Sequence, residues 1–164
     1  MMKSFTLRNS LKVALIPFLT FGFVASEAYG VTIFTENIGT GSGTQTIAAT
    51  TFQNSGTYTY SGTGDTRTST PSTGYTGASG AKNVFLTNNS TSSFQIADIV
   101  TTGYTNFALT FGAHKSTTAS NMTELVVEYS TDGTNYFPLT FPAQPAVGGS
   151  AVWRLVAITG GTIP

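Results

Sequence analysis

Few side chains in this sequence are able to do acid, base or metal chemistry. His114 is the single histidine, and there is no cysteine. A serine hydrolase would need a serine and a carboxylate beside His114, and no Gly-x-Ser-x-Gly motif is present to carry such a serine. One histidine without thiolates also falls short of the usual zinc ligand set. The sequence therefore favours a chain that does not itself catalyse a reaction.

The carboxylates are spaced poorly for glycoside hydrolysis, which needs two of them about 5–10 Å apart. Glu124 and Glu128 share one face of a predicted strand, but the rise per residue separates them by about 13 Å. Glu36 stands beside Asn37 at the end of another predicted strand, and hard oxygen ligands of this type suit calcium. Glu36 is the candidate ligand for a structural calcium ion, and no other cofactor is expected.

Polar side chains on three predicted strands make up the candidate binding face. Sheets that bind sugars present exposed aromatic rings and a few polar groups that orient hydroxyls. If the three strands are neighbours, their outward side chains line one face, with a loop tyrosine at its rim. An ordinary polar outer face without a ligand explains the same pattern. The candidate ligand-binding residues are Tyr75, Thr110, His114, Glu128 and Arg154.

The elements that must position these side chains are predicted to be β-strands. After residue 30 the apolar residues recur at every second position, and no window keeps a helical repeat. Many short strands without helices predict an all-β fold, a two-sheet antiparallel β-sandwich of jelly-roll or immunoglobulin-like type. The immunoglobulin type is the weaker option, because the Cys…Trp…Cys spacing is missing. Strands are predicted over residues 31–36, 57–61, 83–87, 93–97, 106–115, 124–130, 136–141 and 152–159.

Three local features refine this prediction. Asp132 and Gly133 supply the residue types that a tight hairpin turn needs. Pro138 lacks an N–H, so its strand is expected at a sheet edge or in a bulge. Residues 152–159 are apolar on both faces apart from Arg154, which predicts a central strand. Residues 62–80 are rich in Gly, Ser and Thr and are predicted to form a long loop, which is either functional or a plain surface connection.

Residues 1–30 are predicted to be a signal peptide. The N-terminal region is positively charged, with Lys3, Arg8 and Lys12. An apolar run over residues 13–25 follows this region. That run is shorter than the roughly 20 apolar residues that a membrane span requires. Small residues at signal-peptidase spacing place the cleavage after Ala28 or Gly30. The mature chain is therefore expected to be secreted or held at the cell surface, without a membrane span.

Composition narrows the class of protein. Charged residues make up 9% of the chain, well below the roughly 25% of ordinary soluble domains. After residue 30 there are four basic and six acidic residues, so the net charge is near −2. A protein that binds nucleic acid through basic charge is excluded. Hydrophobic residues at 40% allow a packed core. The lack of cysteine fits an exported bacterial protein.

Four segments carry a resemblance to a known family. They are Phe34–Asn37, Ser72–Gly80 with the following Asn83–Phe85, Phe111–Ser116 and Val127–Tyr136. As a set they resemble the galactose-binding-like jelly-roll domain, an accessory module of secreted bacterial nucleases, peptidases and other multidomain surface proteins. The resemblance covers residues 31–164.

The resemblance implies a binding or structural module, with catalysis in a neighbouring domain. In the family the pattern continues into two more strands, one of them rich in Asp, which also completes calcium sites. This sequence lacks both, so the domain over residues 31–164 is expected to be truncated at its C-terminus. The expected function is adhesion to a polysaccharide or a cell-surface glycan. The alternatives are a structural spacer or assembly domain without a ligand, and the N-terminal part of a secreted hydrolase or nuclease.

Overall fold

The regular elements of this chain are short antiparallel β-strands. The structure is a computed structural model that describes residues 30–80, 82–87, 91–115, 124–141 and 152–158. Within these ranges the one helical element is a 3-10 turn, η1 (Ile47–Ala49). The prediction of an antiparallel all-β chain is confirmed. The predicted signal peptide lies outside the described residues, apart from Gly30.

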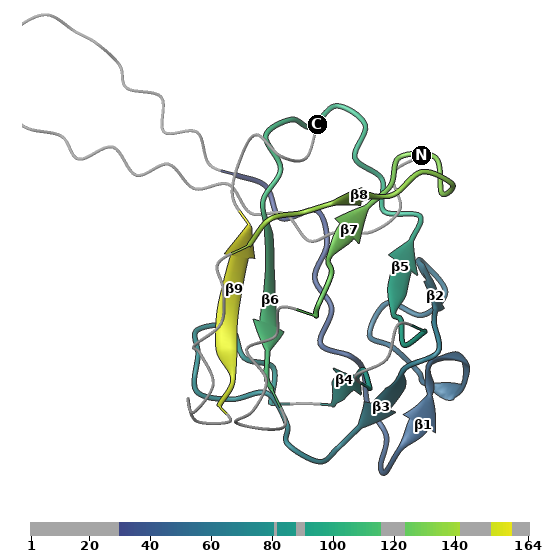
Figure 1. Cartoon of the computed structure of the whole chain (residues 1–164), viewed down its shortest axis with the longest axis vertical. Coiled ribbons are helices and arrows are strands. Elements are labelled where there is room, and N and C mark those ends of the chain that lie inside the picture. The colour runs from purple at the N-terminus through teal and green to yellow at the C-terminus, as the bar shows by residue number, and fades with distance from the viewer. Residues whose placement is uncertain (1–29, 81, 88–90, 116–123, 142–151, 159–164) are drawn as a thin grey trace, which may run out of the picture.

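The described strands form one three-stranded sheet and three two-stranded sheets. The larger sheet has the order β1-β3-β4, while β2 pairs with β5, β6 with β9 and β7 with β8, all antiparallel. Figure 1 shows β6 and β9 side by side, with β2 and β5 across the molecule. The bounds are β1 Gln45–Thr46, β2 Thr59–Ser61, β3 Asp65–Arg67, β4 Asn83–Phe85, β5 Gln95–Ala97, β6 Leu109–Ala113, β7 Glu128–Tyr129, β8 Phe137–Pro138 and β9 Arg154–Ile158.

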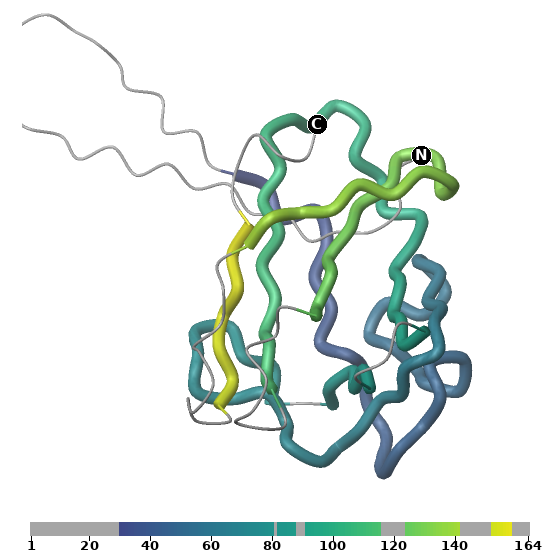
Figure 2. The backbone as a smooth tube through the Cα atoms, in the orientation of Figure 1, coloured from purple at the N-terminus to yellow at the C-terminus, as the bar shows by residue number. Residues whose placement is uncertain are grey.

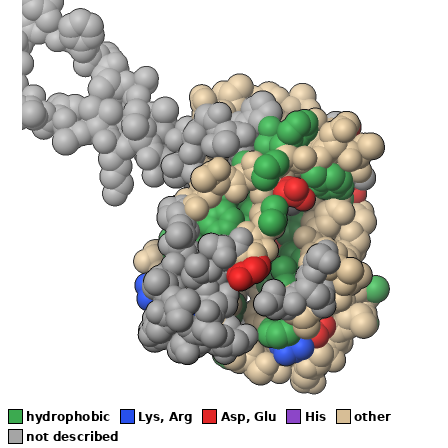
Figure 3. Space-filling view, in the orientation of Figure 1, with side chains coloured by type: hydrophobic (Ala, Val, Ile, Leu, Met, Phe, Trp, Pro, Cys, Tyr) green, Lys and Arg blue, Asp and Glu red, His purple; other side chains and the backbone are tan. Residues whose placement is uncertain are grey.

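The main hydrophobic core joins the β6–β9 sheet to the β7–β8 hairpin. Leu109 and Ile158 lie directly opposite each other in the register of β6 and β9. Their shared face packs against Tyr129 and Leu139 of the hairpin region. Figure 3 shows further hydrophobic side chains exposed over β7 and β8, with few charged side chains among them. The β6–β9 sheet therefore has one face toward the core and one face away from it.

A second apolar cluster consists of stacked aromatic rings. Phe52 lies parallel to Tyr60 with 4.0 Å between ring centroids, and Phe94 stacks at 5.7 Å from Phe52. These rings come from the segment after η1, from β2 and from the residue before β5. We call Phe52, Tyr60 and Phe94 the aromatic stack. It ties the β2–β5 sheet to the N-terminal part of the described chain.

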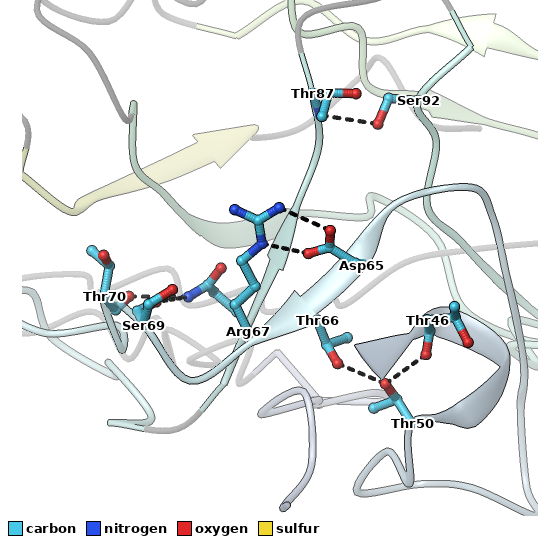
Figure 4. A network of polar contacts seen from close by, with 10 residues as sticks. Thr46, Thr50, Asp65, Thr66, Arg67, Ser69, Thr70, Thr87 and Ser92 are labelled. Carbon is cyan, nitrogen blue, oxygen red and sulfur yellow. Dashed lines mark hydrogen bonds and ion pairs between the residues drawn. The ribbon is translucent and has the colours of Figure 1, made fainter. Parts of the chain in front are cut away.

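The β1–β3–β4 sheet is held from within by threonine hydroxyls (Figure 4). Thr66 of β3 is completely buried, and its hydroxyl lies 2.6 Å from that of Thr50. The Thr50 hydroxyl donates its single hydrogen to the Thr46 carbonyl at 2.9 Å. Because a hydroxyl has one hydrogen, Thr66 must be the donor to Thr50. The chain of hydrogen bonds therefore runs in one direction, from Thr66 to Thr50 to Thr46.

Three predictions about single segments are corrected. Residues 31–36 are not a strand, although Phe34 is buried. The predicted loop over residues 62–80 contains β3, the central strand of the three-stranded sheet. Among the described residues β9 pairs with β6 alone, so the predicted central position is not observed. These ranges also contain no helix with the length and hydrophobicity that crossing a membrane requires.

The hairpin predicted at Asp132 and Gly133 is confirmed. Tyr129 of β7 lies opposite Phe137 of β8, and Gly133 takes a positive φ of 74° in the turn between them. Within the described residues β8 has β7 as its single neighbour. Pro138 is therefore at a sheet edge, as predicted, where its missing N–H interrupts no ladder.

The hairpin turn should make stability depend on acid pH. The Asp132 carboxylate accepts hydrogen bonds from the backbone N–H groups of Asn135 and Thr134, both at 2.8 Å. These bonds, led by that of Asn135, lower the pKa of Asp132 well below its usual range. A lowered pKa in the folded state contributes stability that is present above about pH 4 and is lost as pH falls.

Asp132→Asn should therefore lower the melting temperature at neutral pH, and the gap to the wild type should close as pH falls toward 2. Thermal unfolding followed by circular dichroism at a series of pH values measures this gap. Thr131→Ala changes the same turn without removing a carboxylate, so its effect should not vary with pH. A gap for Asp132→Asn that stays constant over the whole series would contradict the assignment.

Candidate functional site

Three aromatic side chains meet where β6 ends and β9 begins. The Trp153 ring lies 5.2 Å from the ring of His114 and 6.5 Å from that of Tyr75, measured between centroids. All three side chains are half-buried. Such rings combine a large apolar surface with a polar edge that remains in contact with water. We call Tyr75, His114 and Trp153 the aromatic platform.

The register of β6 and β9 places the aromatic platform on the face away from the core. Leu109 and Ile158 of the core lie opposite each other, and so do Gly112 and Leu155. Side chains alternate between the two faces of a sheet, and directly paired residues share a face. Gly112 and Leu155 therefore belong to the outer face, where Leu155 is 46% exposed. His114 and Trp153 continue this face beyond the paired residues.

Tyr75 reaches this face from a loop that joins two strands of a different sheet. It lies in the connection between β3 and β4, residues 68–82, of which residues 68–80 are called the platform loop. Figure 2 shows this loop leaving the β3–β4 hairpin and lying beside β6 and β9. The long Gly/Ser/Thr-rich segment therefore carries one ring of the aromatic platform.

Tyr75 is accommodated because residue 112 has no side chain. A Cβ atom at Gly112 would lie 2.0 Å from the Tyr75 hydroxyl oxygen and 2.6 Å from its Cζ atom. Two atoms that are not bonded to each other cannot lie this close, so a side chain at residue 112 would displace the Tyr75 ring. Gly112, inside the five-residue strand β6, therefore provides the space in which Tyr75 lies against this strand.

The base of the platform loop is fixed by Thr70. Its carbonyl oxygen accepts hydrogen bonds from Trp153 Nε1 and from Asn83 Nδ2, each at 3.1 Å. Thr70 has a φ of 59°, a left-handed conformation that is uncommon for a β-branched residue. Such a conformation persists where the surrounding contacts define it. The Thr70 carbonyl therefore orients the indole ring relative to the loop.

The loop is also closed upon itself. Ser72 is buried, and its Oγ accepts a hydrogen bond from the Ser79 backbone N–H at 3.1 Å. The Ser72 carbonyl accepts from the Gly80 N–H, also at 3.1 Å. The Tyr75 carbonyl accepts from the Ala78 N–H at 3.1 Å. These bonds hold the backbone on both sides of Tyr75 and thereby preorganise its position.

The structure brings together two of the five predicted binding residues. Tyr75 and His114 belong to the aromatic platform, and Thr110 lies on the same face of β6. Arg154 is opposite Ala113 in the register, so it belongs to the other face. Glu128 lies on β7 in a separate sheet, opposite Pro138. The expectation that Thr110, His114, Glu128 and Arg154 share one face is therefore wrong for Glu128 and Arg154.

The resemblance to galactose-binding-like domains stays a prediction. No protein-family model, curated protein or solved structure matches this chain. The described residues do show the antiparallel all-β organisation that such a domain requires.

Trp153 is the site residue that the sequence analysis missed. Residues 152–159 are apolar on both faces, so their hydrophobic pattern does not reveal which residues face the core. Arg154 was assigned to the outer face. Because side chains alternate along a strand, this assignment implies that the adjacent Trp153 faces the core. The two buried residues of β9, Val156 and Ile158, have the same parity as Arg154. The usable signal was that Trp153 is the single tryptophan of the chain.

Glu36, the candidate calcium ligand, serves as a hydrogen-bond acceptor. Its Oε1 accepts from the Gln53 N–H at 2.9 Å, and its Oε2 accepts from the Asn54 N–H at 3.2 Å and the Tyr60 hydroxyl at 2.5 Å. Burial and this hydrogen bond from its own hydroxyl raise the pKa of Tyr60. Among the described residues no group of three or more His, Cys, Asp or Glu is placed to hold a metal ion. The observed role of Glu36 is to join residues 53 and 54 to β2.

Proposed function

We propose that this chain is a secreted, non-catalytic module that attaches a larger exported protein to carbohydrate at a surface. Its fold in this proposal is a jelly-roll β-sandwich, to which the antiparallel all-β organisation is suited. The observation that supports the function best is the aromatic platform. Tyr75 and Trp153 are half-exposed rings whose positions are set by hydrogen bonds and by Gly112.

The chemistry of the aromatic platform fits binding better than bond cleavage. Rings offer a flat apolar surface on which the C–H face of a sugar packs, while nearby hydroxyls orient the ligand. Cleavage of a glycosidic bond would need two carboxyl groups near the ligand. Glu124 precedes β7 and Glu128 lies on it, outside the β6–β9 sheet. The residues at hand therefore supply recognition, with any catalysis assigned to a neighbouring domain.

Trp153→Ala should remove most of the binding to an insoluble polysaccharide. A buried or stacked aromatic residue at the centre of an interface commonly contributes about 2 kcal/mol or more, which corresponds to a loss of more than about tenfold. The measurement is depletion of the purified mature chain from solution by a panel of insoluble plant, bacterial and fungal polysaccharides.

Val126→Ala is the matched control, because Val126 is 63% exposed and belongs to the β7 region. It should bind like the wild type. Equal binding by Trp153→Ala and the wild type would move the site elsewhere. If no polysaccharide depletes the wild type, the structural spacer becomes the better description of this chain.

A further inference from the structure

We propose that the aromatic platform takes an uncharged, hydroxyl-rich glycan and discriminates against glycans that carry carboxylate, sulfate or phosphate groups. This inference rests on the proposed function and names its ligand class. It follows from where the charged side chains after residue 30 lie.

Every charged residue after residue 30 lies in the described part of the chain. None of them belongs to the platform loop, whose thirteen residues are Thr, Ser, Gly, Pro, Tyr and Ala. None belongs to the outer face of β6 and β9, where the register places Thr110, Gly112, Leu155 and Ala157. The ten charged residues are Glu36, Asp65, Arg67, Lys82, Asp98, Lys115, Glu124, Glu128, Asp132 and Arg154.

The two cations nearest in sequence to the aromatic platform are turned away from it. Arg154 follows Trp153 and is exposed, but its register partner is Ala113, so its side chain leaves the strand on the face opposite the rings. Lys115 follows His114 and is 6% exposed, so its ammonium group is not offered to a ligand on the outer face. The alternation of side chains thus removes both positive charges from the face that carries the rings.

The cationic side chains on either side of the platform loop, Arg67 and Lys82, already have partners within the protein. Before the loop, Arg67 forms a two-pronged ion pair with Asp65 at 2.6 and 2.9 Å, and its guanidinium lies 3.5 Å above the Phe85 ring. After the loop, Lys82 is buried and donates to the Gln45 side-chain carbonyl. An anionic ligand therefore finds no unoccupied cation at either end of the loop.

The polar groups that remain are hydroxyls and the imidazole of His114. Thr68, Thr73 and Thr76 of the platform loop are exposed, and a hydroxyl both donates and accepts hydrogen bonds. Sugar hydroxyls need partners of this kind. Trp153 has already committed its Nε1–H to the Thr70 carbonyl, which leaves the ring surface as its contribution. The site thus combines an apolar ring surface with neutral donors and acceptors.

Desolvation explains the expected discrimination. A neutral sugar exchanges water for hydroxyl partners and ring contact at little electrostatic cost. A carboxylate or sulfate group would lose hydration without meeting a compensating cation, which is unfavourable. Binding that does not depend on ion pairs is also insensitive to salt, because there is no Coulomb attraction to screen.

The test uses pairs of polysaccharides that share a backbone and differ in whether their substituents are charged. The fluorescence of Trp153, the single tryptophan, is titrated with hydroxyethyl cellulose against carboxymethyl cellulose, dextran against dextran sulfate, and methyl-esterified against de-esterified pectin. At least one neutral member should bind about tenfold or more tightly than its acidic partner. Its affinity should change less than about twofold between 0.05 and 0.5 M NaCl.

A second variant tests the charge argument directly. Leu155 is 46% exposed on the outer face and lies two residues from Trp153, so Leu155→Lys adds the missing cation. It should strengthen binding of the acidic member and make that binding salt-dependent, while Val126→Ala should change neither. An unchanged preference in Leu155→Lys would overturn the charge argument.

The outcomes separate this inference from the proposed function. Tighter, salt-sensitive binding of the acidic members would overturn the neutral class and leave carbohydrate attachment standing. Neutral binding that survives Trp153→Ala, measured by depletion because this variant has no tryptophan fluorescence, would overturn the assignment to the aromatic platform alone. Failure of the wild type to bind any of the insoluble or soluble polysaccharides would overturn both.

Discussion

Phe52→Ala is expected to reduce the free energy of unfolding by about 3–5 kcal/mol, the usual cost of removing a buried phenylalanine. Phe52 is 3% exposed and stacks on Tyr60 and Phe94. Domains of this size are stable by about 5–15 kcal/mol in total. The substitution should therefore remove a large share of the stability, because the aromatic stack joins β2 and β5 to the segment after η1.

Urea unfolding followed by circular dichroism measures this loss. Phe52→Leu keeps part of the apolar volume and should lose less than Phe52→Ala. Val100→Ala is the matched control, because Val100 is 71% exposed, and it should change the stability by less than about 0.5 kcal/mol. Similar losses for Phe52→Ala and Val100→Ala would show that the aromatic stack does not stabilise the fold.

Gly112→Ala is expected to displace Tyr75 and to abolish the aromatic platform. The new Cβ atom would lie 2.0 Å from the Tyr75 hydroxyl oxygen, and inserting atoms into a filled space usually costs about 1–3 kcal/mol. Two readouts follow from one substitution. Stability should fall by that amount, and polysaccharide binding should fall as it does in Trp153→Ala.

A double-mutant cycle isolates the contact between Gly112 and Tyr75. In a Tyr75→Ala background the ring is gone, so Gly112→Ala should cost little or even stabilise the strand. The expected coupling energy is about 0.5–3 kcal/mol. The same cost in both backgrounds would show that Gly112 is needed for a reason other than room for Tyr75.

The parts of the fold that were predictable are those set by neighbours in sequence. The Asp132–Gly133 turn was correct because its conformation depends on two adjacent residue types. β6 was correct because Leu109 and Ala113, four positions apart on one face of the strand, are both buried. The edge position of Pro138 followed from its missing N–H. In each case the cause lies within a few residues of the effect.

The strand β3 was missed because its stability comes from contacts distant in sequence. Thr66 is completely buried, yet a threonine in a Gly/Ser/Thr-rich segment looks like a loop residue. Its hydroxyl is satisfied by Thr50, sixteen residues earlier. The reverse error occurred at residues 31–36, where the pattern of a strand is present but the Glu36 carboxylate binds the backbone N–H groups of residues 53 and 54.

The candidate site was predictable in part for the same reason. Tyr75 and His114 were selected as polar aromatic residues at exposed positions, and both belong to the aromatic platform. Arg154 was misplaced because a strand with apolar residues on both faces does not define which face is buried. The register with β6 decides it, and register depends on a partner strand more than forty residues away. Trp153 became visible only once that register was known.

The one-way order of the Thr66, Thr50 and Thr46 hydrogen bonds constrains how this chain can drift under mutation. If the Thr50 hydroxyl is lost, the buried Thr66 hydroxyl has no acceptor for its hydrogen. If the Thr66 hydroxyl is lost, Thr50 still donates to Thr46 and lacks only one of the hydrogen bonds that it accepts. A path toward an aliphatic pair at these two positions is therefore easier when Thr66 changes first. If Thr50 changes first, the single variant on the way to the aliphatic pair is less stable.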